Sequence, residues 1–195
     1  MVVGLTGNFG SGKSTVLEFF RQLGAKTIDS DQSVAKIYAS DEEFKEALRL
    51  KFGSEVFDPD GAVIRKKLGK IAFASSDNLA WLERELHPRV KEIRQNLIKK
   101  APQALWVVEI PLLFEKNLEK EVEYSITVIS NYSLRVDRLK NRGFSPEAVA
   151  ARNSKQLPQA RKASRANFVI LNDGSLEFLK KQVMHLYRQL KSAQA

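Results

Sequence analysis

The stretch GLTGNFGSGKST at residues 4–15 combines glycines with a lysine and hydroxyl residues. Within it, Gly7, Gly12, Lys13 and Ser14 satisfy the pattern G-x-x-x-x-G-K-[ST]. Glycines let a backbone fold around an anion with successive N–H groups pointing inward, and a helix that begins there adds its positive dipole end. The pattern therefore predicts a loop that binds the phosphate groups of a nucleotide.

Two side chains of this loop have expected partners on a triphosphate. The Lys13 ammonium can reach the β- and γ-phosphates, and the Ser14 hydroxyl can bind Mg²⁺. An ordinary glycine-rich turn is the alternative, and a strand before the loop with a helix after it argues against that alternative. The residues expected around ATP and Mg²⁺ are Gly7, Asn8, Phe9, Gly10, Ser11, Gly12, Lys13, Ser14 and Thr15.

A pair of aspartates, Asp29 and Asp31, lies in TIDSDQ at the end of the second predicted strand. Because side chains alternate along a strand, residues two apart can point the same way. One carboxylate could orient an acceptor hydroxyl and take its proton during phosphoryl transfer. Aspartates that cap a helix or form a turn are the alternative.

The elements that must position these residues alternate between strands and helices. Strands separated by helices imply a parallel sheet with right-handed crossovers, so we expect an α/β fold with a five-stranded parallel sheet. Strands are predicted at residues 2–6, 26–29, 104–114, 124–130 and 167–172. Helices around them are predicted at 14–23, at about 133–142 and 146–155, and at 176–190.

A helical stretch from about 32 to 103 is predicted to be an insertion after the second strand. Apolar residues recur at helical spacing between Leu79 and Leu97, and Pro88 interrupts them. Proline lacks an amide donor and disfavours helix at the preceding residue, so we expect a kink or a helix restart around His87. The insertion is large enough to build a second binding surface.

Composition excludes some classes of protein. The 195 residues contain no cysteine, which excludes disulfides, and we find no apolar run suited to a signal peptide or a membrane span. We therefore expect a cytoplasmic protein. The net charge of +9 arises within residues 131–195. That excess suits nucleic-acid phosphates or a lid over small-molecule phosphates, with a merely solvated basic surface as the third alternative.

Other motifs narrow the reaction. A GTPase would need an N-K-x-D stretch to read guanine, and a transporter ATPase would usually carry L-S-G-G-Q; both are absent. A small kinase fits better, because it needs an acceptor site near the carboxyl ends of the strands and basic side chains that neutralise the transferring group.

At this point the residues resemble those of the dephospho-coenzyme A kinases, which phosphorylate the ribose 3′-hydroxyl of dephospho-CoA with ATP. The resemblance implies a three-layer P-loop kinase fold. Its core would comprise residues 1–31 and 104–195, with a mobile lid at about 138–165 and a helical CoA-side insertion at 32–103. The stretches that carry it, in order, are GLTGNFGSGKST, DSD, DPDGAVIR, LHPRV, IPLLFE, RLKNR, Gln156 and ANFVILNDG.

The resemblance also implies roles for single residues. Asp31 becomes the catalytic base, and Arg138 and Arg142 become catalytic arginines at the base of the lid. Arg142 is also expected to bind ATP, and Asn172 lies near the adenine. From the residues alone, a solvated basic face is the alternative for these arginines, and the phosphate loop argues against it. The residues implied to bind the acceptor are Asp29, Asp31, Arg65, His87, Leu112 and Arg161.

The chain departs from the family pattern at several positions. Asn8 and Phe9 replace commoner residues at variable positions of the loop. Glu109 stands where the family usually has aspartate, which puts water-mediated metal contacts from that strand in doubt. Asn167 replaces the usual aspartate of an Ala-Asp pair, which removes a charge near the expected nucleotide side.

The sequence thus predicts an ATP- and Mg²⁺-dependent kinase whose partners are dephospho-CoA and ATP. We expect no nucleic-acid partner, no membrane contact, and a monomer rather than a stable oligomer. Another small-molecule kinase is the principal rival among enzymes. A nucleotide-dependent nucleic-acid-binding module is the rival from a different class of protein.

Overall fold

The computed structural model describes residues 1–194, apart from the side chain of Phe73. The chain divides into two compact units. One, which we call the sheet unit, comprises residues 1–29 and the chain from residue 102 onward. The other, the helical unit, comprises residues 30–101.

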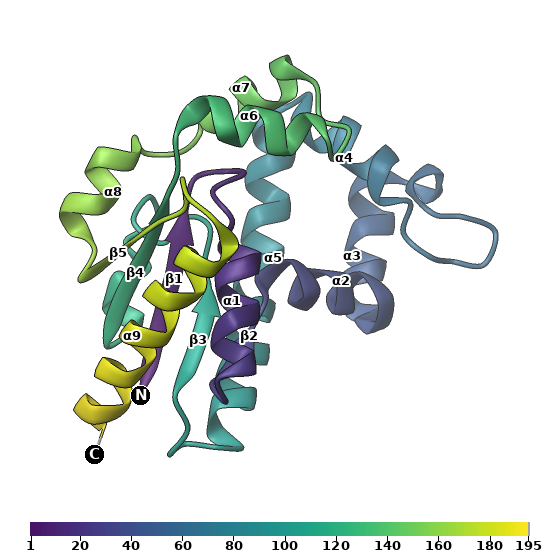
Figure 1. Ribbon diagram of the computed structural model, residues 1–195. Helices are drawn as coiled ribbons and strands as arrows, with labels where there is room; N and C mark the ends of the chain where they lie inside the picture. Colours follow the sequence, from purple (N-terminus) through teal and green to yellow (C-terminus); the bar gives the residue numbers. More distant parts are fainter. Residues whose placement is uncertain (195) are drawn as a thin grey trace. The chain divides into compact units, whose positions relative to one another are not determined.

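The sheet unit is built on a five-stranded sheet in the order β2-β3-β1-β4-β5, in which every pair of neighbouring strands is parallel (Figure 1). The predicted α/β class and five-stranded parallel sheet are therefore confirmed. β1 is the central strand, so the loop that follows its carboxyl end lies midway between the two edge strands. The strands are β1 (Val2–Gly7), β2 (Lys26–Ile28), β3 (Trp106–Glu109), β4 (Tyr124–Ile129) and β5 (Phe168–Leu171).

Two helices, α1 (Lys13–Gln22) and α9 (Leu176–Gln194), pack together against one face of the sheet (Figure 1). The strands present fully buried β-branched and leucine side chains to them, including Val3, Leu5 and Val107. Apolar side chains of the two helices fill the same core, namely Val16, Leu17, Phe20, Leu179, Val183, Leu186 and Leu190. Removing this apolar surface from water is the main force that holds the sheet and helices together.

The other face of β1 is covered by the turn that follows β3. A Cβ atom on Gly4 would lie only 3.2 Å from a methyl group of Leu113 in this turn. Val3 and Leu5 point to the α1 and α9 face, so the intervening residue points the opposite way. The predicted strand 104–114 is therefore too long: β3 ends at Glu109, because the chain turns at Pro111 to cover the sheet.

Three short helices, α6 (Tyr132–Lys140), α7 (Pro146–Asn153) and α8 (Gln159–Arg165), follow one another between β4 and β5. Local signals start the first two, since the side chains of Asn131 and Ser145 accept backbone N–H bonds at their N-termini. The predicted helices match α6 and α7 closely, whereas α8 was not predicted. The residue before this helix, Pro158, makes no side-chain capping hydrogen bond, so α8 lacks the usual start signal.

The helical unit contains α2 (Ser30–Ser40), α3 (Glu42–Phe52), α4 (Arg65–Phe73) and α5 (Ser76–Lys99). Its own core forms around Ile37, Phe44, Leu48, Val56 and Leu68, which are almost completely buried. Asp41 and Ser75 cap α3 and α5 by accepting backbone N–H bonds. The stretch predicted to be helical thus forms a compact unit with its own hydrophobic core.

The helix α5 runs from Ser76 to Lys99 and includes Pro88. Of the two predicted outcomes at His87, a kink or a helix restart, the restart is wrong, because the helix is continuous through this residue. Proline at this position removes one helical hydrogen bond. Apolar side chains on both sides of it, among them Leu86 and Val90, nevertheless pack against the same core. Burial of this shared face holds the two halves in one helix.

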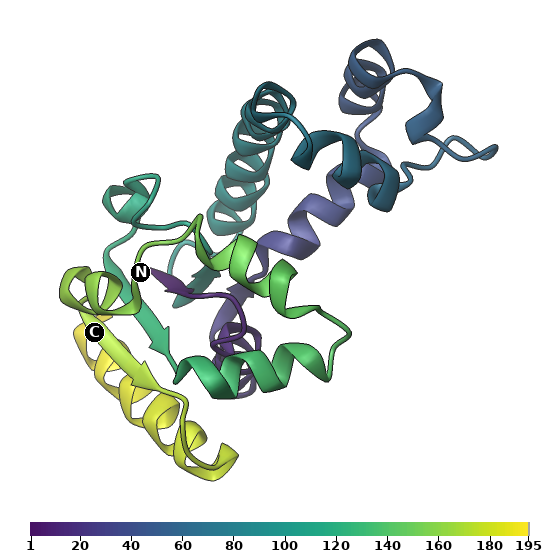
Figure 2. The same ribbon diagram turned by 90° about the horizontal axis from the view of Figure 1, so that it is seen from above.

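The strand β5 lies at one edge of the sheet. Its Val169 and Leu171 side chains are 42% and 47% exposed. Gln182 of α9, which runs alongside β5 in Figure 2, accepts a hydrogen bond from the Leu171 N–H at 3.0 Å and donates one to the Leu171 carbonyl at 2.8 Å. Among the helices of residues 1–194, none has the length and apolar character that crossing a membrane requires.

Candidate active site

The predicted phosphate loop lies between β1 and α1, at the carboxyl end of the central strand. Its glycines are required by geometry. Gly7 has φ of +150°, and a Cβ atom there would lie 2.4 Å from the carbonyl oxygen of Val128. Gly10 has φ of +80°, and its Cβ would lie 2.8 Å from Leu139. Side chains at either position would force this loop open.

Lys13 is the first residue of α1, and its side chain is largely buried beside the loop that precedes it. Its Nζ atom donates to the carbonyl oxygen of Asn8 at 3.5 Å and lies 3.8 Å from a carboxylate oxygen of Glu109. Glu109 is the last residue of β3 and is also buried. The Glu109 carboxylate thus lies beside the Lys13 ammonium as a partner of opposite charge.

The loop is tied from outside by Asn172, which follows β5. Its side-chain Nδ2 donates to the carbonyl oxygen of Ser11 at 2.8 Å, and Arg138 of α6 donates to the Asn172 carbonyl, also at 2.8 Å. Arg138 also donates to the Ser130 hydroxyl at 3.0 Å. The guanidinium of Arg138 thus binds the residue that holds the loop, Asn172, and the Ser130 hydroxyl after β4.

Arg135 of α6 supports the loop from a second side, and no residue pattern had singled it out. Its guanidinium donates to the carbonyl oxygen of Phe9 at 3.1 Å and to the Asn153 side chain at 3.0 Å. Burial lowers the pKa of Arg135, an effect that Tyr132 opposes. Its spacing of three residues from Arg138 on one helix was the signal that could have identified it.

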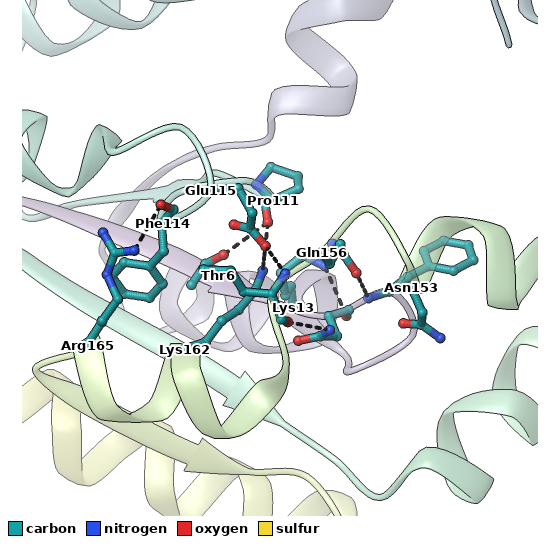
Figure 3. A network of polar contacts seen from close by, with 12 residues as sticks. Thr6, Lys13, Pro111, Phe114, Glu115, Asn153, Gln156, Lys162 and Arg165 are labelled. Atoms are coloured by element: carbon teal, nitrogen blue, oxygen red, sulfur yellow. Dashed lines mark hydrogen bonds and ion pairs between the residues drawn. The ribbon is translucent and has the colours of Figure 1, made fainter. Parts of the chain in front are cut away.

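The segment after α7 also contacts the loop. Gln156 accepts a hydrogen bond from the Phe9 N–H at 2.8 Å, and the Leu157 carbonyl accepts one from the Asn8 side chain at 3.1 Å. Figure 3 shows Gln156 beside the loop, together with the polar network around Glu115 and Lys162. The loop thus has contacts from α6, from the segment after α7, and from the residue after β5.

Arg152 of α7 completes the surroundings of the loop. Its guanidinium lies 4.5 Å from the ring centroid of Phe9 and 4.8 Å from that of Phe144. The two rings meet edge to face with centroids 5.1 Å apart. A cation–π interaction between Arg152 and Phe9 therefore connects α7 to the phosphate loop.

Other predicted arginines have open surroundings. Arg142, just after α6, and Arg161 in α8 are both exposed. Leu112 is half-buried in the turn after β3. Ser14 is exposed at the start of α1, so its hydroxyl oxygen, a hard ligand, fits a Mg²⁺ ion. Within residues 1–194 there is no cluster of three acidic or histidine side chains that could hold a metal.

The predicted acceptor residues fall in both units. Asp29 is half-buried after β2 in the sheet unit, whereas Asp31 is exposed in the first turn of α2 in the helical unit. His87 is exposed on α5. Arg65 begins α4, and its guanidinium lies 5.3 Å from the ring centroid of Tyr38, whose pKa is raised by burial against the effect of that arginine.

Asn167 does not lie where the sequence pattern suggested. It precedes β5 and accepts hydrogen bonds from the backbone N–H and the hydroxyl of Ser125, at 2.8 and 2.9 Å. These contacts are at the amino ends of β4 and β5, whereas the phosphate loop follows the carboxyl end of β1. The expectation of a position near the nucleotide side is wrong. The amide oxygen here joins two strand ends.

Comparisons with known proteins identify the family of this chain. The family model described as dephospho-CoA kinase matches residues 1–177. A dephospho-CoA kinase of Aquifex aeolicus is 36% identical over 192 residues, which cover 96% of each chain. The crystal structure of TT1252 from Thermus thermophilus has a TM-score of 0.85 at 34% identity, covering 97% of both chains. Dephospho-CoA kinase from Campylobacter jejuni has a TM-score of 0.72 at 25% identity, covering 100% of this chain and 98% of that chain.

Proposed function

The chain belongs to the dephospho-CoA kinase family, and from this premise we propose that it transfers the γ-phosphoryl group of ATP to the ribose 3′-hydroxyl of dephospho-CoA. The products are CoA and ADP, so the reaction belongs to coenzyme A biosynthesis. The observation that carries the proposal is the phosphate loop at the carboxyl end of β1, with Lys13 at its base, in a chain matched by the family model over residues 1–177.

The donor side of the reaction is assigned to the sheet unit. The loop amides and the Lys13 ammonium hold the phosphate groups of ATP, and the exposed Ser14 hydroxyl is the protein ligand of Mg²⁺. Bound Mg²⁺ would neutralise charge on the β- and γ-phosphate oxygens. Asn172 is the proposed neighbour of the adenine, and its side-chain amide also fixes the loop through Ser11.

The acceptor side of the reaction needs a base and residues that bind dephospho-CoA. Asp31 is the proposed base: its carboxylate orients the ribose hydroxyl and takes its proton as the phosphoryl group moves. Its exposure at the first turn of α2 supports this role, because a carboxylate must be reachable by substrate. The other residues proposed to bind dephospho-CoA are Asp29, Arg65, His87, Leu112 and Arg161.

The basic residues of the last third are assigned to phosphate capture. Arg142 is exposed and can reach phosphate oxygens with a planar, permanently charged group. Arg138 is proposed to act beside it at the base of a lid over residues 138–165, although its guanidinium also binds the loop surroundings. A nucleic-acid partner is not part of the proposal. Tight DNA or RNA binding that falls steeply with salt would contradict this assignment.

A panel of acceptors tests the proposed function. The full chain is supplied with ATP, Mg²⁺ and, separately, dephospho-CoA, adenosine, AMP, cytidine and shikimate. ADP release is measured, and the product is identified by mass and by the position of the new phosphate. We expect strong preference for dephospho-CoA, since binding of its pantetheine arm helps to orient the ribose. Equal or faster phosphorylation of a nucleoside would contradict the proposal.

The role of Asp31 has its own test. Asp31→Asn keeps the size of the side chain but cannot accept the proton, so kcat should fall by about 10²- to 10⁴-fold with ATP affinity nearly unchanged. Asp29→Asn is the matched control two residues earlier and should affect kcat less. Steady-state kinetics and ATP titration give both quantities. Full activity of Asp31→Asn would overturn the base assignment and leave the kinase intact.

A further inference from the structure

A buried ion pair joins α8 to the turn after β3. Lys162 of α8 is completely buried, and its Nζ atom lies 2.9 Å from the Oε1 atom of Glu115 (Figure 3). The same ammonium donates to the carbonyl oxygen of Pro111 at 3.2 Å. Burial lowers the pKa of Lys162, and the hydrogen bond and charge of Glu115 oppose that shift. Such a cation is costly to bury without its carboxylate partner.

Glu115 has a second contact through the same oxygen. Oε1 also accepts a hydrogen bond from the Leu157 N–H at 2.8 Å, while Oε2 is buried and has no hydrogen-bond partner among residues 1–194. One carboxylate oxygen thus holds both Lys162 and the backbone of Leu157. The ammonium restricts the carboxylate to the position from which it can accept from Leu157.

Leu157 and its neighbour are in turn bound to the phosphate loop. The Leu157 carbonyl accepts from the Asn8 side chain, and the Gln156 side chain accepts from the Phe9 N–H. Since Arg135 donates to the Phe9 carbonyl, both backbone groups of Phe9 are occupied by contacts from outside the loop. We call residues 156–157 the strap.

We propose that Glu115, fixed by Lys162, is a positioning residue for ATP binding, because it holds the strap that fixes Asn8 and Phe9 of the phosphate loop. Asn8 and Phe9 lie between Gly7 and Gly10, where the backbone must keep a shape that matches phosphate. A loop already fixed in this shape loses less conformational freedom when the nucleotide binds. The inference rests on the proposed function, which makes ATP the ligand of the loop.

Two double variants distinguish the effect of losing the hydrogen bond to the strap from the effect of losing the ion pair. Glu115→Leu with Lys162→Met removes the ion pair and the acceptor for the Leu157 N–H. Glu115→Gln with Lys162→Met removes the same ion pair but keeps a carbonyl oxygen that can accept from Leu157. Neither variant leaves a lone buried charge, and replacing a buried pair by uncharged groups is often near neutral for stability. Unfolding midpoints of the two variants serve as the check.

The readout is the pair of dissociation constants for ATP and dephospho-CoA, measured by calorimetry on the full chain. We expect the leucine variant to bind ATP about 5- to 20-fold more weakly than wild type, from loss of one buried hydrogen bond. The glutamine variant should lose clearly less. Dephospho-CoA affinity should stay constant in both, which a general loss of structure would not allow. Equal ATP affinity in the two double variants would overturn the positioning role.

Further variants keep the test decisive. Glu119→Gln removes the neighbouring ion pair between Glu119 and Arg165 of α8, whose hydrogen bonds within residues 1–194 go to Phe114, Asn117 and Glu119 and not to the strap, and should leave ATP affinity unchanged. If the leucine variant fails to fold, Gln156→Met removes the acceptor for the Phe9 N–H and should weaken ATP binding selectively. Unchanged ATP affinity there would equally contradict the role. A wild-type chain that bound no ATP would instead contradict the proposed function.

Discussion

The α6 helix and the exposed segment after it carry arginines in different surroundings. Arg135 and Arg138 direct their guanidinium groups to backbone carbonyls and side chains around the phosphate loop. Arg142, four residues beyond Arg138, is exposed, and so is Arg161 in α8. The sequence pattern treats Arg138 and Arg142 as an equivalent pair, whereas the structure separates an engaged inner group from an exposed outer group.

The difference concerns what each arginine can do before and after a substrate arrives. An engaged guanidinium stabilises the fold around the loop, because its removal leaves buried carbonyl oxygens without a donor. An exposed guanidinium adds little to stability on its own, yet it can move to a phosphate group and bind it with two parallel hydrogen bonds. Removal of an inner arginine should therefore lower the stability of the fold, whereas removal of an outer arginine should leave stability almost unchanged and affect substrate binding or catalysis.

The largest expected effect is at Lys13, which is buried like the inner Arg135 and is also proposed to touch phosphate. Lys13→Ala should reduce kcat/KM by about 10²- to 10³-fold or more, since it removes a charge aimed at the transferring group. Unlike an outer substitution, it should also lower the free energy of unfolding, by about 1–3 kcal/mol, because buried Glu109 loses a nearby cation.

Kinetics of ADP release and urea denaturation measure the two effects of Lys13→Ala. Lys13→Met is the control that keeps most of the buried apolar stem. Near-normal turnover in Lys13→Ala would show that the phosphate-loop assignment is wrong. A large loss of activity with unchanged stability would place Lys13 with the outer group and break the comparison.

An intermediate effect is expected from the matched pair Arg142→Ala and Arg138→Ala. Arg142→Ala should reduce kcat by about tenfold or more while the free energy of unfolding changes by less than about 0.5 kcal/mol. Arg138→Ala should lower that free energy by about 1–3 kcal/mol, since the Asn172 carbonyl and the Ser130 hydroxyl lose a donor. Equal stability losses in the two variants, or a raised KM with unchanged kcat in Arg142→Ala, would contradict this division.

The smallest expected effect is a pH dependence of stability at Lys162. Because burial lowers its pKa, the unfolded chain binds more protons than the folded chain between that lowered pKa and the usual lysine pKa of about 10.5. Across this window the stability of wild type relative to Lys162→Met should rise with pH, by no more than about 1.4 kcal/mol per pH unit.

Chemical denaturation at several alkaline pH values measures this difference. Lys140→Met, at an exposed position on α6, is the matched control and should show no such trend. A stability difference between wild type and Lys162→Met that stays constant, or falls as pH rises, would show that the pKa of Lys162 is not lowered in the folded chain.

The parts of the molecule that sequence predicts well are those determined by local chemistry. The phosphate loop needs glycines where φ is positive, so Gly7, Gly10 and Gly12 indicate its presence in the sequence. The flanking strand and helix are predicted from the periodicity of apolar residues. Parallel strands follow from their separation by helices. The caps of α6 and α7 are local as well, and both helices are close to their predicted positions.

Contacts between residues far apart in the chain escape prediction. Nothing near Glu115 indicates that its partners are Leu157 and Lys162, since burial brings them together only in the folded chain. The expected position of Asn167 near the nucleotide is wrong, because this residue binds Ser125 near the amino end of β4, away from the phosphate loop. Pro88 predicted a possible helix restart on local grounds, yet the shared core of α5 decides otherwise.

The side-chain amide of Gln182 has a consequence for association between molecules. An unpaired strand at a sheet edge is a template on which another chain can add a strand, and the exposed Val169 and Leu171 make this edge attractive to one. Gln182 occupies both backbone groups of Leu171 as a neighbouring strand would. An incoming strand must displace these two bonds before it can pair there, so one glutamine protects the enzyme's edge against aggregation.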